Sequence, residues 1–365
     1  MKKSKILLLV FIFSLTMLAA ISLPTAAEGD VEEVKVQVSI HPIYAMAERI
    51  AGDRLQVEQV APHGVEIHGF EPSPRQIAEL EGADAFIFIG AGLEPWGERA
   101  AESLAHEGIE ILELAEKVEL RPYEDEHNHD HGHDHDEHAH DDHEDDHEHD
   151  EHGHNDHNHE HEDEHDEHGH DDHEHAHDHD EHAHDHDHDH GEYDTHIWLD
   201  FEIMQETAAE ISDLFSSLDP EGEDIFQENM RDVQEKLAEL DRTYQEELAD
   251  RTHDDIIVSH AAFGFMADNY GLNQHAVTGL SPHDEPSPRT VSELIETASE
   301  TGVDYIFMEE LASPETVNVV ADEAGLEILQ INPGHGLTEE DVEKGRDYFD
   351  IMYDNLENLK KALDA

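Results

Sequence analysis

A run of 68 residues in the middle of the chain, Glu124 to Gly191, restricts the fold more than any other feature of the sequence. It consists almost entirely of His, Asp and Glu, with a few Gly, Ala and Asn. Such a segment lacks the apolar side chains whose burial offsets the entropy of ordering a chain, so we expect a disordered loop. Apolar patterning resumes at Tyr193, which makes the segment an insertion and not a tail. The core must therefore be built from the two flanking parts of the chain.

The part before the insertion alternates between strand and helix patterns. Ala85 to Ile89 is a continuous apolar run, which is typical of a strand buried on both faces. Pro74 stands where proline commonly opens a helix. The full set of predicted elements consists of strands at Val34–Ile40, Leu55–Val60 and Ala85–Ile89 and helices at Ile43–Ala51 and Pro74–Glu81. This alternation predicts a mainly parallel sheet flanked by helices.

The part after the insertion begins with a helical region, from about Glu202 to Asp250. Its apolar residues recur at steps of three and four, as Phe226, Met230, Val233, Leu237, Leu240 and Tyr244. A helix from Glu221 to Leu248 would span about 40 Å at about 1.5 Å per residue, enough to join two lobes. The strand and helix alternation then returns, with strands predicted at Ile256–Val258, Tyr305–Met308 and Leu326–Ile331.

These patterns predict an α/β fold of two lobes with mainly parallel sheets, joined by one long helix. The N-terminal lobe takes residues 28–123 and 192–220 and is interrupted by the loop at 124–191. The linking helix takes residues 221–250, and the C-terminal lobe takes residues 251–365.

Residues 1–27 have the pattern of an export signal peptide. Lys2, Lys3 and Lys5 precede an apolar stretch from Ile6 to Ile21, and small residues follow at Thr25-Ala26-Ala27. The alternative is an uncleaved anchor, since the apolar stretch is near the lower limit for spanning a membrane. Under either interpretation the rest of the chain lies outside the cytoplasmic membrane, in the periplasm or at the cell surface.

The chain is strongly acidic, with a formal net charge of −75 from Asp+Glu 94 and Lys+Arg 19. Glu124 to Asp194 holds 33 of these acids, and the remainder still carries 61 against 19 bases. Such a charge disfavours nucleic acid and anionic lipid as partners. It is typical of a salt-loving source, where screening weakens the self-repulsion of an acidic fold. The absence of cysteine excludes disulfides, thiolate metal sites and lipid attachment through cysteine.

Ten of the 37 histidines lie outside the insertion, and three of them have informative neighbours. His68 precedes the predicted helix at Pro74, His196 lies where patterned sequence resumes, and His260 follows the strand Ile256–Val258. Ligand sites in open α/β sheets form at the carboxyl ends of strands, which favours His260. Each histidine alone is more often a core or surface group than a ligand, and their wide separation in sequence does not join them.

Several motifs along the whole chain are similar to those of one family. They are Val36–Ile43 with Ile50–Asp53, His68–Pro74, Gly90–Trp96, His196–Asp200, Ser259–Phe263, and Glu285–Pro288 with Phe307–Glu310. In these stretches the chain resembles the zinc-specific solute-binding proteins that serve ABC importers. The resemblance implies a monomeric, non-enzymatic protein that captures Zn²⁺ and hands it to an ABC transporter permease. It also implies that His68, His196 and His260 are the metal ligands, at a site in the cleft between the two lobes.

The resemblance leaves the fourth ligand open. The family's carboxylate position falls on Asn332, and an asparagine amide is a weak zinc ligand. Water, a loop histidine, His335, His63 or a nearby acid such as Glu66 are the alternatives. Three neutral imidazoles suit zinc, whereas manganese prefers more oxygen ligands.

Two acids follow the ligand motifs directly, Glu71 and Asp200. We expect them to orient the imidazoles by accepting the second ring N–H, a common arrangement around metal-binding histidines. Helix capping or plain surface charge is an equally reasonable role for each. The indole rings of Trp96 and Trp198 are expected to pack in the core.

The insertion itself holds 27 of the histidines, interleaved with acids, and would bind several metal ions weakly. The zinc-specific branch of the family commonly carries such a loop. One alternative function is therefore an extracellular zinc store or adhesin in which the loop is the main binder. Another is a zinc hydrolase with three histidines and a water. The predicted helices carry no His-Glu-x-x-His pattern and the chain has no G-x-S-x-G elbow, which disfavours the hydrolase.

Overall fold

The computed structural model describes residues 34–123, 193–283, 285–309 and 314–364. The predicted signal peptide and the predicted loop at residues 124–191 lie outside these residues. Within the described ranges, no helix is both long enough and apolar enough to cross a membrane.

The first half of the described chain forms a four-stranded parallel sheet in the order β2-β1-β3-β4. The strands are β1 (Lys35–Val38), β2 (Gln56–Gln59), β3 (Ala85–Phe88) and β4 (Glu110–Glu113). Between them run α1 (His41–Ala51), α2 (Pro74–Leu80) and α3 (Pro95–Glu107). The predicted strands and helices of this half are confirmed to within a few residues, and Pro74 does occupy the first turn of α2. The buried strand β3 lies in the interior of the sheet, as its continuous apolar sequence requires.

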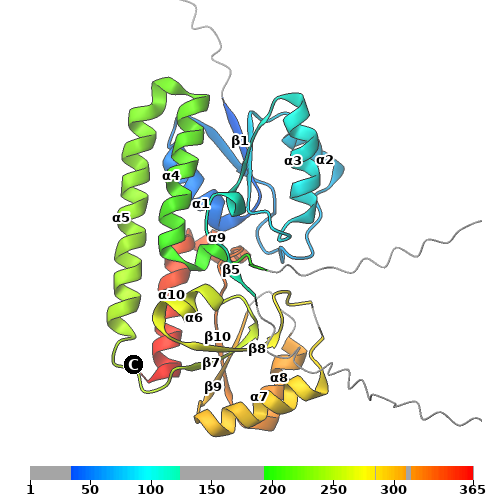
Figure 1. The fold of residues 1–365 in the computed structure, drawn as a ribbon, viewed down its shortest axis with the longest axis vertical. Helices are drawn as coiled ribbons and strands as arrows, with labels where there is room; N and C mark the ends of the chain where they lie inside the picture. The colour runs from blue at the N-terminus through cyan, green and yellow to red at the C-terminus, as the bar shows by residue number, and fades with distance from the viewer. Residues whose placement is uncertain (1–33, 124–192, 284, 310–313, 365) are drawn as a thin grey trace, which may run out of the picture.

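The second half repeats this arrangement in a second parallel sheet, ordered β10-β9-β7-β8. Its strands are β7 (Asp255–His260), β8 (Asn273–Thr278), β9 (Tyr305–Met308) and β10 (Glu327–Gln330). Its helices are α6 (Gly264–Tyr270), α7 (Pro288–Thr301), α8 (Pro314–Ala324), α9 (Glu339–Lys344) and α10 (Tyr348–Leu363). In Figure 1 the first sheet lies above the second.

The helical region that separates the two sheets in sequence is an antiparallel pair. Its helices, α4 (Phe201–Leu218) and α5 (Glu223–Glu247), pack against each other. The turn between them contains a single 3₁₀ turn at Pro220–Gly222. Figure 1 shows α5 running along one side of the molecule, past both sheets. The apolar residues predicted to line this helix are buried, from Phe226 to Tyr244.

The two halves share one apolar core. A single cluster of buried side chains joins Val36 of β1, Leu237 of α5 and Val258 of β7. Hydrogen bonds reinforce the junction: the Trp198 indole donates to the carbonyl of Pro333 at 2.6 Å, and the Tyr348 hydroxyl donates to the carbonyl of Trp198 at 2.6 Å. Trp198 is therefore a packing residue, as expected from the sequence.

A short antiparallel hairpin flanks the insertion. β5 (Arg121–Pro122) pairs with β6 (Tyr193–Asp194), so the two ends of the described chain on either side of residues 124–192 lie together. Asp194 is fully buried, and Arg121 lies 3.9 Å from it. The hairpin thereby fixes the chain immediately before His196.

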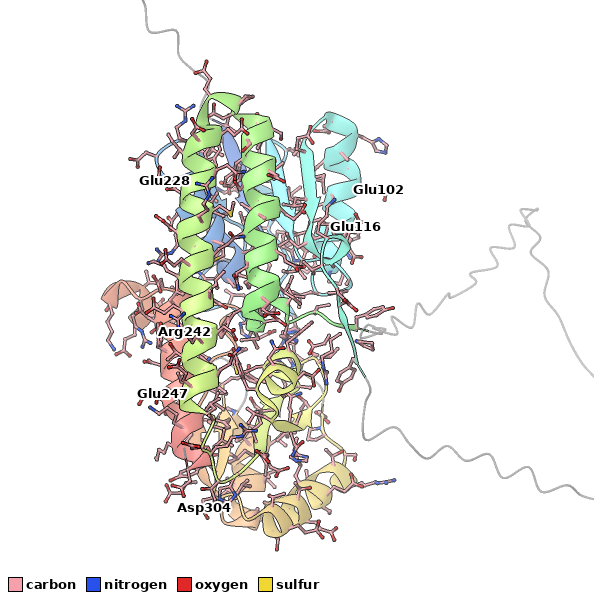
Figure 2. The ribbon with its side chains drawn as sticks, turned by 60° about the vertical axis from the view of Figure 1, so that its left-hand side comes forward. Glu102, Glu116, Glu228, Arg242, Glu247 and Asp304 are labelled. Atoms are coloured by element: carbon pink, nitrogen blue, oxygen red, sulfur yellow. The ribbon has the colours of Figure 1, made fainter. Side chains whose placement is uncertain are left out.

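Exposed acids cover the described surface, with Glu102, Glu116, Glu228, Glu247 and Asp304 as examples on different elements (Figure 2). Since acids greatly outnumber bases, most of them have no cation to pair with.

We expect the melting temperature to rise as NaCl increases from about 0.1 to about 1 M, because the screening length falls from about 10 to about 3 Å. Circular dichroism melts in a salt series would measure it. Replacing Glu102, Glu116 and Glu228 with Gln should reduce the slope, and a melting temperature indifferent to salt would contradict the expectation.

Candidate metal centre

Three histidines from distant parts of the chain meet between the two sheets. His68 lies in the loop between β2 and α2, His196 directly follows β6, and His260 ends β7. One ring nitrogen of each lies within 4.8 Å of the others. Their ring centroids are 5.3 to 5.5 Å apart. We call these three residues the histidine cluster.

The spacing inside the histidine cluster suits a small tetrahedral ion. The Nε2 atoms of His196 and His260 are 3.4 Å apart. Zinc–nitrogen bonds of about 2.0–2.1 Å at tetrahedral angles place two ligand nitrogens roughly 3.4 Å apart. The His196 and His260 side chains are fully buried, and His68 is only slightly exposed. Buried imidazoles in this arrangement can bind a metal ion while most of its surface is shielded from water.

A carboxylate holds the Nδ1 side of each imidazole. Glu66 accepts from Nδ1 of His68 at 2.5 Å, Asp194 accepts from Nδ1 of His196 at 2.8 Å, and Glu309 accepts from Nδ1 of His260. A carboxylate partner keeps the proton on Nδ1, so the lone pair is on Nε2. In His68 this Nε2 is buried and has no hydrogen-bond partner among the described residues.

Two of these carboxylates are positioned by local sequence. Glu66 and Asp194 each stand two residues before a histidine, and one oxygen of each accepts both the ring N–H and the backbone N–H of that histidine. The backbone bond is 3.0 Å in both cases. An acid two positions before a histidine is a signal that the sequence contains, but Glu66 was predicted only as a possible ligand.

The third carboxylate depends on the sheet. Glu309 directly follows β9, and Val258 of β7 pairs with Phe307 of β9. His260 and Glu309 each lie two residues beyond that pair, so they meet at the carboxyl edge of the sheet. The Ser259 hydroxyl also donates to Glu309. No spacing along the chain could have joined His260 to Glu309, because the contact exists only across neighbouring strands.

The acids predicted to orient the imidazoles have other partners. Glu71 is largely exposed and forms an ion pair with Arg99 at 3.0 Å. Asp200 caps α4, accepting from the backbone N–H of Glu202 and Ile203. Asp200 begins α4 as its N-cap, and Glu71 is held by Arg99, so neither side chain is available to an imidazole. Glu66, Asp194 and Glu309 take the role instead.

His335 is the nearest further imidazole. Its ring centroid lies 6.0 Å from that of His68, and its side chain is only 2% exposed. Its Nε2 lies 3.8 Å from Oε2 of Glu309, beyond hydrogen-bond distance, and neither ring nitrogen has a hydrogen-bond partner among the described residues. Among the described residues, the group whose ligand atoms all lie within 4.8 Å of one another is the histidine cluster alone, so His335 is a buried neighbour of the cluster with both ring nitrogens unpaired.

Asn332, the position predicted from the family for the fourth ligand, is occupied elsewhere. Its Oδ1 accepts from the backbone N–H of Gly334 at 2.8 Å, and its backbone bonds to the side chain of Asn355 in both directions. The side chain thus shapes the turn that carries His335. The turn brings His335, three residues later, to the cluster.

The charges favour a cation at the histidine cluster. Burial lowers the pKa of His68 and of His196 below the ordinary value of 6.5, so both rings are neutral at pH 7. Burial alone would raise the pKa of Glu66 and of Glu309, but hydrogen bonds from the neighbouring imidazoles, together with the charge that these rings carry when protonated, outweigh it and hold both pKa values below the usual range. Neutral rings backed by ionised carboxylates are the state that binds a metal ion.

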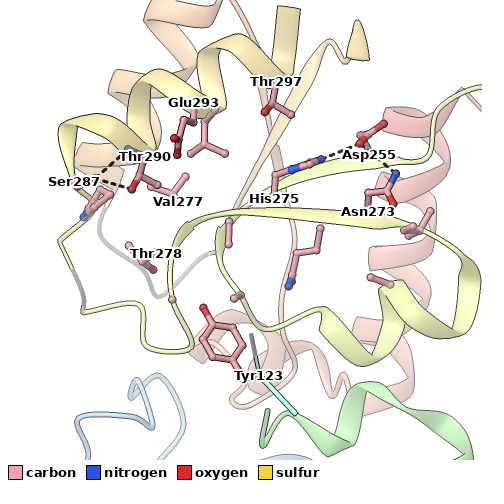
Figure 3. A pocket seen from close by; sticks show the side chains of 18 of the residues that line it. Tyr123, Asp255, Asn273, His275, Val277, Thr278, Ser287, Thr290, Glu293 and Thr297 are labelled. Atoms are coloured by element: carbon pink, nitrogen blue, oxygen red, sulfur yellow. Dashed lines mark hydrogen bonds and ion pairs between the residues drawn. The ribbon is translucent and has the colours of Figure 1, made fainter. Parts of the chain in front are cut away.

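A cavity of about 840 Å³ lies elsewhere, in the second half of the chain, along β8 and α7 (Figure 3). Within it His275 bonds to Asp255 at 2.8 Å, and Ser287 bonds to Thr290. No member of the histidine cluster lines this cavity, so its size does not bear on the metal centre.

Comparison with known proteins identifies the family. Residues 36–362 match ZnuA, described as "Zinc-uptake complex component A periplasmic". The zinc-binding lipoprotein AdcA of Streptococcus pneumoniae is 29% identical over 99% of this chain. This chain spans 61% of that relative's length. The high-affinity zinc uptake system protein ZnuA of Bacillus subtilis is 27% identical over 93% of this chain and 90% of its own.

Solved structures agree with the sequence comparison. Zn(II)-bound AdcA of Streptococcus pneumoniae has a TM-score of 0.66 and 26% identity, covering 91% of this chain and 58% of that one. Its isolated Zn(II)-bound ZnuA-like domain has a TM-score of 0.65, with 91% of this chain and 100% of that one covered. The likeness covers both parallel sheets. Because the family model matches residues 36–362, nearly the whole of this chain, the chain belongs to the ZnuA family of zinc-uptake components.

Proposed function

We propose that this chain captures zinc outside the cytoplasmic membrane and delivers it to an ABC-type importer. The observation that carries the proposal is the histidine cluster, in which three imidazoles converge and a carboxylate holds each of them. The relatives named zinc-binding or zinc-uptake proteins support the same function. The signal-like residues 1–27 would direct export to the periplasm or cell surface, or would remain as an anchor.

In this proposal the ligands are His68, His196 and His260 through Nε2, with His335 as the fourth. Asn332 is set aside because its amide oxygen caps the turn before His335. Four neutral imidazoles around a tetrahedral ion suit zinc. Manganese, which prefers oxygen ligands and higher coordination, should bind poorly.

A fourth imidazole also distinguishes capture from catalysis. Catalytic zinc sites keep one position open for water, whereas sites with four protein ligands are closed. His335 is buried, like His196 and His260 of the histidine cluster, and would fill the position that a hydrolytic water needs. The proposed protein is therefore a carrier, not an enzyme, acting as a monomer whose partners are the zinc ion and the permease.

The competing function is a zinc store dominated by the insertion, which its 27 histidines favour. Calorimetric titration of the chain with residues 124–191 deleted separates the two functions. We expect one tight zinc site, weak binding of manganese, and loss of the tight site in His260→Ala. His253→Ala, at a half-buried histidine before β7 that lies outside the histidine cluster, is the matched control. Absence of a tight site in the deletion variant would assign zinc binding to the insertion.

The carboxylates should matter to affinity without touching the ion. Asp194→Asn removes the charge that holds the proton on Nδ1 of His196, and losing such a partner costs roughly 10- to 100-fold in metal affinity. Glu71→Gln is the control, because Glu71 bonds to Arg99 and not to an imidazole. Competition against a zinc chelator measures both. Equal affinities of the two variants would rule out the orienting role of Asp194.

Zinc affinity should depend on pH in a way set by burial. Metal binding needs neutral imidazoles, and burial lowers the pKa of His68 and His196 below 6.5. Affinity should therefore stay nearly constant from pH 8 to about 6.5 and fall only in more acidic solution. A free peptide of residues 124–191, whose imidazoles stand beside ionised acids that favour their protonation, should lose zinc at higher pH. If the deletion variant lost zinc at the same pH as the peptide, the buried-cluster explanation would be wrong.

A further inference from the structure

A second pair of histidines lies outside the histidine cluster, on the first half of the chain. His41 is the first residue of α1 and is 4% exposed, and His63 is an exposed residue of the loop after β2. Their ring centroids are 5.6 Å apart and the rings meet edge to face. The same measure inside the histidine cluster is 5.3 to 5.5 Å, so the pair has nearly the spacing of rings that can share one ion.

The protonation of His41 can be assigned from its neighbour. Gln59 uses its Nε2 to donate to the carbonyl of Ala61, which directs its Oε1 toward Nδ1 of His41 at 3.4 Å. An amide oxygen only accepts, so Nδ1 of His41 carries the proton and the lone pair lies on Nε2. This repeats the arrangement of the histidine cluster, with an amide in place of the carboxylate.

The unpaired ring nitrogen of His41 is a second observation that points to a ligand at this pair. Nε2 of His41 is buried and has no hydrogen-bond partner among the described residues. Burial, and to a smaller extent the charge of the nearby His63, lowers the pKa of His41 to about 4. The ring is therefore neutral at physiological pH. A buried, unprotonated and unpaired nitrogen costs folding free energy unless something binds it. His63, the neighbouring imidazole, is reached by solvent.

The surrounding charges suit a cation. Asp347 and Asp341 act on His41 electrostatically and favour positive charge there. Neither is free to coordinate, since Asp347 pairs with Arg49 and caps α10, and Asp341 caps α9 and pairs with Arg346. They contribute a field and not ligand atoms.

We propose that His41 and His63 form a second, weaker site for a zinc ion or another divalent ion that prefers imidazole, such as Cu²⁺ or Ni²⁺. Two imidazoles supply the protein ligands, and water completes the shell on the exposed side of His63. Weaker binding than at the histidine cluster follows from the smaller number of protein ligands. The backbone N–H of Gly64 donates to the carbonyl of Leu337 at 2.8 Å, so this site adjoins the segment that carries His335.

The test is site-resolved labelling of the full chain with diethyl pyrocarbonate, which modifies accessible imidazoles, followed by peptide mass spectrometry. We expect added zinc to slow the modification of His63, at a higher concentration than saturates the histidine cluster. His106, exposed on α3, is the internal control and should react at an unchanged rate. The protection should persist in His260→Ala, which removes the histidine cluster, and should be lost in His41→Gln.

A second measurement covers the case in which His41→Gln fails to fold. Crystals of the full chain with zinc should give anomalous density between His41 and His63, and His63→Ala, at an exposed residue, should abolish it. Unprotected His63, protection that survives a folded His41→Gln, or density absent while the histidine cluster is occupied would each overturn the second site. Loss of zinc at the histidine cluster alone would instead count against the proposed capture function.

Discussion

The hydrogen bond from the Nδ1–H of an imidazole to a carboxylate is the interaction on which the candidate metal centre depends. It occurs at His68, His196 and His260, with Glu66, Asp194 and Glu309 as acceptors. Each bond fixes the orientation of a ring and its tautomer, and so decides which nitrogen faces the centre. Burial then keeps the rings of His68 and His196 neutral, as their lowered pKa values indicate. Position, tautomer and charge are thus set before any ion arrives.

The fold supplies the acids by two different routes. Glu66 and Asp194 are local. Each stands two residues before its histidine, so the contact needs no other part of the chain. Glu309 arrives across the sheet, because β7 and β9 are neighbours and end at the same edge. The hairpin of β5 and β6 adds a further constraint, since it holds Asp194 in place despite the insertion that precedes it. The preformed site therefore depends on local sequence, on the pairing of strands in the sheet and on the β5–β6 hairpin.

The sequence predicted the strands well where their apolar runs are continuous. β9 has the predicted bounds, Tyr305–Met308, while β8, Asn273–Thr278, was missed because its residues are mostly polar and it lies at the edge of the sheet. The helical region was predicted, and the helix expected at Glu221–Leu248 is α5, Glu223–Glu247, whereas the bounds of α4 were not predicted. Local context distinguished His68, His196 and His260 from the other histidines, but only the family resemblance grouped them as ligands. Their orienting acids were not found, because the contact between His260 and Glu309 exists only in the folded sheet and the acid before His68 was interpreted as a ligand.

The shared core has a consequence for how fast an ion can leave. One apolar cluster runs from β1 through α5 to β7, and Trp198 and Tyr348 bond across the junction of the two halves. Swinging the halves apart would bring this apolar surface into water, at about 25 cal/mol for each Å². The activation barrier to release must instead be set by smaller displacements of individual loops. His68, the one member of the cluster that is not fully buried, lies on such a loop. Under the proposed capture function, the lifetime of a bound ion would therefore depend on the residues around His68 more than on the stiffness of α5.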